Sequence, residues 1–133
     1  MGKATTAPLV LSVLIALAGV NCGILGGPPF SEKGADSVLS YLLVDYSIGG
    51  DSRAKGPKVL LKVANGGSQY HELEVTDGQG ERVGRVPPFP VGMTLRPLYL
   101  KLKAGTYTLQ CNIKNQDGKV HRDLGMTLKL EVQ

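Results

Sequence analysis

The chain has 133 residues, which is enough for one ordinary domain, and its 42% hydrophobic and 20% charged residues exclude a disordered protein. Its net charge of +4 suits a soluble basic protein that docks on an acidic partner. The fifteen Lys and Arg are scattered and the aromatic residues do not alternate with them, which argues against a nucleic-acid-binding protein. Eighteen Gly and eight Pro favour a β-rich domain over a helical bundle.

The N-terminal segment, residues 1–25, is almost uncharged. Lys3 is its only charged residue, and a long apolar run follows. A basic start before a short apolar core is typical of an export signal, with Ala16-Leu17-Ala18 as the cleavage site. Two alternatives stay open: an uncleaved membrane anchor through residues 4–25, and a lipid-modified Cys22. All three predict an extracytoplasmic domain, in the periplasm, on the outer face of the cytoplasmic membrane, or secreted.

The rest of the chain reads as a linker and one domain. Residues 26–36 are rich in Gly, Pro and small polar residues, which predicts a linker, and residues 37–133 form the predicted domain. Short β-type runs separated by turn signals predict strands over residues 38–48, 58–64, 70–76, 82–86, 95–102, 106–114 and 126–132. Their number and spacing predict an all-β fold, a Greek-key antiparallel sandwich.

Cys111 is the only cysteine in the predicted domain, so a disulfide framework is not expected. A lone thiol in an oxidising compartment is a chemical liability. A metal ion that holds the sulfur as a thiolate would remove that liability.

Strand alternation places three distinctive side chains on inner faces. Cys111 lies on the apolar side of its strand, and Met126 begins the inner face of the last strand. His71 occupies an inward position where an aliphatic residue is expected, while Glu72 beside it should face water. Each inward residue alone has an ordinary explanation as part of a core. With His121, the second of only two histidines, they supply the two imidazoles, thiolate and thioether of a blue-copper centre.

Three segments also resemble the cupredoxin family of type 1 blue-copper proteins. The sequence VANGG before HELEV (residues 63–75) looks like the strand that supplies the first histidine. AGTYTLQC (residues 104–111) looks like the strand that leads to the copper cysteine. HRDLGM and the strand after it (residues 121–132) are similar to the closing ligand loop. The resemblance covers about residues 36–133. It implies that the domain binds one copper ion. The implied equatorial ligands are His71, Cys111 and His121, and the implied axial ligand is Met126.

One feature departs from the family pattern. Nine residues separate Cys111 from His121, more than in familiar cupredoxins. The insertion contains the turn signal Asn115-Gln116-Asp117-Gly118, which predicts a small hairpin that folds out and returns His121 to the site.

The residues that are missing around Cys111 and in the rest of the sequence exclude several kinds of copper site and catalytic site. No second cysteine lies near Cys111, which excludes a dinuclear copper centre, and no histidine flanks it to build a trinuclear cluster. No paired carboxylates indicate a catalytic pocket, so an enzyme is not expected. We expect a carrier of single electrons between redox partner proteins of a membrane electron-transfer chain.

In that function His121 would be the solvent-near edge through which electrons pass. Residues 87–93 (PPFPVGM) would either dock the partner or only pack one end of the sandwich. Two other functions stay open: copper delivery or sensing, and a metal-free accessory subunit of a membrane complex.

Overall fold

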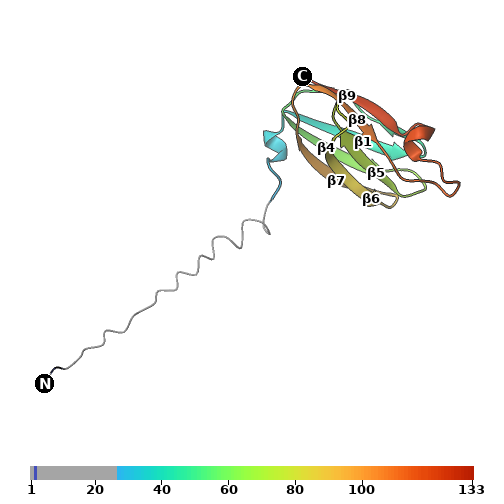
Figure 1. Ribbon diagram of the computed structural model, residues 1–133, viewed down its shortest axis with the longest axis horizontal. Helices are drawn as coiled ribbons and strands as arrows, with labels where there is room; N and C mark the ends of the chain where they lie inside the picture. The colour runs from blue at the N-terminus through green and yellow to red at the C-terminus, as the bar shows by residue number, and fades with distance from the viewer. Residues whose placement is uncertain (1, 3–26) are drawn as a thin grey trace.

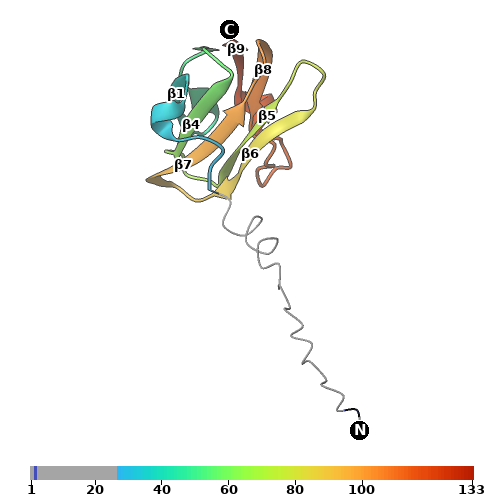
Figure 2. The ribbon, with the colours of Figure 1, turned by 90° about the vertical axis from the view of Figure 1, so that its left-hand side faces the viewer.

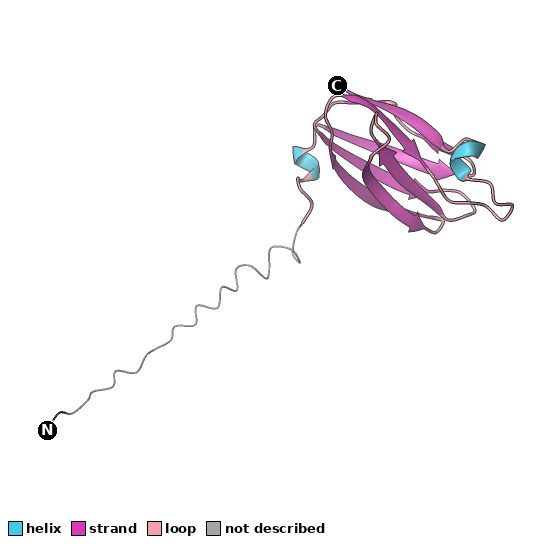
Figure 3. Ribbon diagram, viewed as in Figure 1, coloured by secondary structure: helices cyan, strands magenta, loops and turns pink. Residues whose placement is uncertain are grey.

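The computed structural model describes Gly2 and residues 27–133. The predicted signal or anchor, residues 1–25, therefore lies almost wholly outside the described residues. Within them, nine strands form two sheets packed face to face, with two short 3-10 helices (Figures 1 and 3). No helix of this described part is both long enough and apolar enough to cross a membrane.

The first sheet has the order β2-β1-β4-β7 and forms one of the two layers visible in Figure 2. Its strands are β2 (Ser47–Gly49), β1 (Ser37–Val44), β4 (Lys58–Asn65) and β7 (Gly92–Lys101). β1 and β4 run parallel, whereas the β1–β2 and β4–β7 pairs are antiparallel.

The second sheet has the order β3-β9-β8-β5-β6. Its strands are β3 (Arg53–Ala54), β9 (Thr127–Val132), β8 (Gly105–Gln110), β5 (His71–Thr76) and β6 (Arg82–Phe89). Only the short β3 pairs parallel, with β9. The predicted all-β sandwich is confirmed, but its sheets are mixed. The segment between β1 and β4 contributes a strand to each sheet, and this crossover returns the chain in the direction of β1.

Three predicted strands end elsewhere. The run predicted over residues 106–114 ends at Gln110, directly before Cys111. The run predicted over residues 38–48 breaks after Val44, because the chain reverses there to pair Val44 with Ser47. β6 instead continues through Pro87 and Pro88 to Phe89. These prolines fit because β6 lies at the edge of its sheet, where one side of the backbone needs no hydrogen-bond partner.

The core lies between the layers and follows the alternation read from the sequence. In β8 and β9 four of the predicted inner residues are buried, and Leu128 is partly buried. The four are Tyr107, Leu109, Leu130 and Val132. They meet side chains of the first sheet, such as Leu43 and Val63, in one hydrophobic cluster. Burial of these apolar faces is the main force that holds the two sheets together.

Residues 27–36, predicted as a linker, contact the first sheet. Phe30 is buried and packs edge-on against Tyr99, with ring centroids 5.3 Å apart. The 3-10 helix η2 (Glu32–Gly34) places Glu32 2.6 Å from Lys62 of β4. This segment is therefore held against the sandwich, and the division of the chain at residue 37 remains a prediction.

Candidate metal centre

The chemically distinctive side chains lie where strands of the second sheet begin or end. His71 is the first residue of β5, and Cys111 directly follows β8. Because β5 and β8 are antiparallel, the start of one lies beside the end of the other. His121 begins the 3-10 helix η3 (His121–Leu124), which leads through Met126 into β9. One end of the sandwich therefore gathers all four residues.

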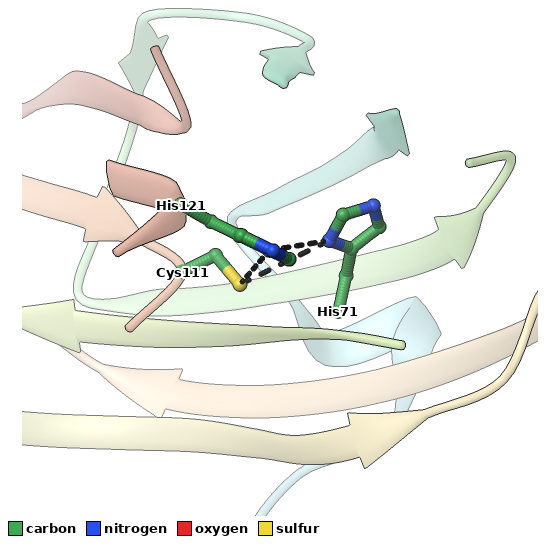
Figure 4. Close-up of side chains that lie close together, drawn as sticks. All are labelled: His71, Cys111 and His121. Atoms are coloured by element: carbon green, nitrogen blue, oxygen red, sulfur yellow. Dashed lines mark hydrogen bonds between the residues drawn. The ribbon is translucent and has the colours of Figure 1, made fainter. Parts of the chain in front are cut away.

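The three donor atoms of His71, Cys111 and His121 form a small triangle (Figure 4). The two Nδ1 atoms lie 3.2 Å apart. Cys111 Sγ lies 3.6 Å from His121 Nδ1 and 4.0 Å from His71 Nδ1. All three residues are 0% exposed to solvent. Among the described residues, this is the one group of three or more His, Cys, Asp or Glu side chains with the spacing of a metal site.

The long segment before His121 folds as predicted. Asn115 N–H donates to the Lys119 carbonyl at 2.8 Å, and Lys114 and Val120 form an antiparallel bridge. His121 N–H then donates to the Ile113 carbonyl at 2.8 Å. The insertion is thus a hairpin that projects beside η3 (Figure 1), and it returns His121 to the site.

Met126 is fully buried and belongs to the same core cluster as Cys111. Its N–H donates to the His121 carbonyl at 3.1 Å, and its own carbonyl accepts from Cys111 N–H at 3.2 Å. The backbone of Met126 is therefore tied to two of the three donors. Its role as an axial ligand remains a prediction.

The triangle has the size that a trigonal metal centre requires. With bonds of about 2.0 Å to imidazole nitrogen and about 2.3 Å to thiolate sulfur, such a centre separates its nitrogens by about 3.5 Å and each nitrogen from sulfur by about 3.7 Å. The observed nitrogen–nitrogen separation of 3.2 Å is about 0.3 Å shorter than this value, and the observed nitrogen–sulfur separations of 3.6 and 4.0 Å bracket theirs. Two imidazoles and one thiolate are the donors that coordinate copper in the trigonal plane of blue-copper sites. The residues present therefore fit one copper ion.

The electrostatics of Cys111 favour a cation. Burial raises the pKa of the Cys111 thiol, and the negative charge of Glu72 acts in the same direction. The backbone N–H groups of Glu72 and Ile113 act against this rise, and the former lies 3.5 Å from Sγ. These dipoles do not suffice to ionise the thiol, so a bound cation would have to stabilise the thiolate.

His121 is fully buried, and the expectation of a solvent-near histidine edge is wrong. The Tyr46 ring packs against His121 at a centroid distance of 5.1 Å and an interplanar angle of 63°. His121 Nε2 is buried and has no hydrogen-bond partner among the described residues. Burial and the neighbouring His71 lower the pKa of His121, and Asp45 partly offsets this. The difference arises because the turn between β1 and β2, which the sequence had assigned to a strand, covers the ring.

Asp45, in that same turn, was not recognised from the sequence. Its Oδ1 lies 2.6 Å from His71 Nε2, on the opposite side of the ring from the donor triangle. Burial acts to raise its pKa, but hydrogen bonds from Ser68 and His71 outweigh this and hold the pKa of the Asp45 carboxyl below its usual range. The available signal was a single charged residue inside the apolar run LLVDYSI, which marks a turn and not a strand interior.

Glu72 was expected in water and is 4% exposed instead. It does point away from His71 along β5, but Arg85 and Asn112 lie over it. Arg85 Nη2 lies 2.6 Å from Glu72 Oε2, and Asn112 N–H donates to Oε1 at 3.2 Å. The carboxylate therefore links β5, β6 and the segment that carries Cys111.

By sequence, neither a protein-family model nor a curated protein matches the chain. Solved structures do resemble it. Reduced auracyanin from the photosynthetic bacterium Roseiflexus castenholzii has a TM-score of 0.59 at 12% identity, over 75% of this chain and 99% of that one. Auracyanin A, a "blue" copper protein from Chloroflexus aurantiacus, has a TM-score of 0.56 at 14% identity, over 72% and 98%. Reduced rusticyanin has a TM-score of 0.55 at 14% identity, over 80% and 88%.

The sandwich is therefore a cupredoxin fold, as the three sequence segments had indicated. The buried group of His71, Cys111 and His121 at one end of the sandwich is consistent with that class of protein.

Proposed function

We propose that this protein is a mononuclear type 1 copper protein that carries single electrons and is not an enzyme. The observation that carries the proposal is the buried triangle of His71, Cys111 and His121 on a cupredoxin sandwich. Bound copper would supply the one-electron chemistry by alternating between Cu(I) and Cu(II). His71, Cys111 and His121 would hold it, together with the thioether of Met126.

The chain's own contribution is a fixed ligand geometry. Cys111 is held through both of its backbone groups: its N–H donates to the Met126 carbonyl, and its carbonyl accepts from Arg122 N–H at 2.8 Å. The Glu72 N–H points at its sulfur. Donors fixed in this way change little between oxidation states, which keeps the reorganisation on electron transfer small.

Electrons would enter through Tyr46. The predicted ligands are all fully buried, so a partner has to reach them through a covering side chain. Tyr46 is half-buried, contacts His121, and lines a surface hollow with Gln69 and the tip of the hairpin (residues 115–117). Gln69 Nε2 donates to the Tyr46 hydroxyl at 2.7 Å, which orients the ring. We therefore place the docking of redox partner proteins at this hollow.

The segment at residues 87–93 divides between its two predicted roles. Phe89 is buried and packs the sandwich, whereas Val91 and Met93 are 57% and 78% exposed. Because Phe89 pairs with His71, these exposed residues lie at the same end of the sandwich as the site. They form the apolar part of the proposed docking face.

The proposed location is extracytoplasmic. It rests on the export-signal or anchor character of residues 1–25 and on the lone thiol of Cys111, which a metal would protect there. The partners would then belong to a membrane electron-transfer chain.

The test is a visible absorption spectrum of the purified protein after addition of Cu(II). We expect an intense thiolate-to-copper band that Cys111→Ser abolishes. Cys22→Ser is the matched control, since it removes the other thiol and should leave the band intact. A colourless protein that retains no copper would favour the metal-free accessory subunit. Rapid loss of copper to a chelator, without a stable blue form, would favour copper delivery.

A further inference from the structure

We propose that Asp45 is a positioning residue that orients His71 and biases the centre toward the oxidised metal. This inference rests on the proposed copper function. The observation behind it is the contact between the Asp45 carboxylate and His71 Nε2, on the far side of the ring from the donor triangle.

The contact fixes which nitrogen of His71 can bind a metal. Nδ1 faces Cys111 and His121, while Nε2 lies 2.6 Å from Asp45 Oδ1. A carboxylate accepts hydrogen bonds, so the neutral ring carries its proton on Nε2 and leaves the Nδ1 lone pair free. Asp45 thus selects the tautomer that can ligate through Nδ1.

The carboxylate is itself held in place. Ser68 N–H lies 3.2 Å from Oδ1 and 3.1 Å from Oδ2, and the Ser68 hydroxyl donates to Oδ2. The Asp45 side chain is 21% exposed, compared with 0% for His71. The charge is therefore near the surface, but its direction toward the ring is set by the segment after β4.

Gly67 shows how closely this segment covers the contact. A Cβ atom at this position would lie 2.6 Å from His71 Nε2 and would also collide with Asp45 Oδ1. Only glycine allows the backbone to pass so near the hydrogen bond. The Gly67 backbone therefore covers one side of the contact, while the Asp45 carboxylate stays partly exposed.

His121 lacks such a partner, which makes the two imidazoles unequal. Its Nε2 has no hydrogen-bond partner among the described residues. A carboxylate on His71 alone raises the donor strength of that ring and brings negative charge toward the metal. Cu(II) gains more from both effects than Cu(I), so Asp45 lowers the reduction potential.

The experiment compares Asp45→Asn with the wild type in the copper-loaded protein. Asparagine retains the size and one acceptor oxygen but removes the charge. Loss of such an outer partner weakens metal binding by about 10–100-fold. We expect the affinity for Cu(II) to fall more than the affinity for Cu(I). For each factor of ten by which the loss in Cu(II) affinity exceeds the loss in Cu(I) affinity, the reduction potential rises by about 59 mV. The visible band should persist, because no ligand is removed.

Two further variants separate positioning from general charge. Asp117→Asn removes an exposed carboxylate from the hairpin at the same end of the molecule, and its potential should stay near that of the wild type. Ser68→Ala retains the charge but loosens the carboxylate, so its potential should lie between those of the wild type and Asp45→Asn. Equal potentials for Asp45→Asn and Asp117→Asn, with the band intact, would overturn the proposal.

A second readout does not depend on copper. Nitrogen NMR of the histidine rings in the metal-free protein at neutral pH should show His71 protonated on Nε2, and Asp45→Asn should reduce that preference. A wild-type His71 protonated on Nδ1 contradicts the proposal even if copper binds. Absence of any copper band, with the Nε2 tautomer present, contradicts the proposed function alone.

Discussion

The ion pair between Glu72 and Arg85 gives a quantitative test of how the outer face of β5 stabilises the site. Glu72 has a side-chain exposure of 6%, and Arg85 has 39%. Arg85 donates to Glu72 Oε2 through Nε at 2.9 Å and through Nη2 at 2.6 Å. Breaking a wholly buried pair from one side costs about 3–5 kcal/mol. Because Arg85 is more than a third exposed, water replaces part of its contribution, and we expect Arg85→Gln to cost about 1.5–3 kcal/mol.

Substitution of the other partner, Glu72, should cost less stability. Glu72→Gln keeps an oxygen for Asn112 N–H and leaves Arg85 free to turn to water, so the expected loss is about 1 kcal/mol. The double variant removes both charges together and should lose less than the sum of the single losses. Urea unfolding of all four proteins should therefore give a coupling energy of about 1–2 kcal/mol. A coupling below about 0.5 kcal/mol is typical of exposed surface pairs and would refute the reasoning.

Three other outcomes follow from the structure. Gly125→Ala should destabilise the fold by about 2 kcal/mol or more in thermal unfolding, since φ is +126° and the new Cβ would lie 2.6 Å from the Tyr46 carbonyl oxygen. Gly118→Ala has a positive φ but nothing within 4 Å, so it should cost only about 1 kcal/mol; equal losses would contradict the steric argument. Tyr46→Leu should slow electron self-exchange several-fold, measured by NMR on mixed oxidation states, without changing the reduction potential. An equal slowing by Tyr70→Leu, which alters an exposed tyrosine, would remove Tyr46 from the route. Because burial lowers the pKa of His121, the unfolded chain takes up a proton first as pH falls below about 6.5, so the metal-free protein should lose stability there by up to about 1.4 kcal/mol per pH unit. His121→Gln should flatten that slope in urea unfolding at pH 7.5 and 5.5, and an unchanged slope would assign it to other groups.

Local patterning was enough to predict the sandwich and the inward direction of most of the candidate ligands. Alternation over the predicted runs 106–114 and 126–132 placed Cys111 and Met126 on inner faces. Both are fully buried, although Cys111 lies just after β8 and Met126 just before β9. These predictions succeed because the direction of a strand side chain depends only on its position along that strand. The return of His121 was also local information, since the hairpin in the insertion closes on itself through Asn115 and Lys119.

Contacts between distant segments were decided by the tertiary structure. The sequence assigned Asp45 to a strand, yet it contacts His71, which lies 26 residues further on. Glu72 has the outward parity expected of a solvated residue, and Arg85 of β6 together with the segment at Asn112 buries it. His121 has no local feature that predicts its cover by Tyr46.

The sequence by itself thus determined most of the strands and the inward direction of His71, the Cys111 thiol and the Met126 thioether. The tertiary structure alone decided how the donors meet, what hides them from solvent, and which of the two imidazoles receives a carboxylate. The physical reason is that backbone alternation is fixed within each strand, whereas the surroundings of His71 and His121 come from a turn that packs onto them from the other sheet.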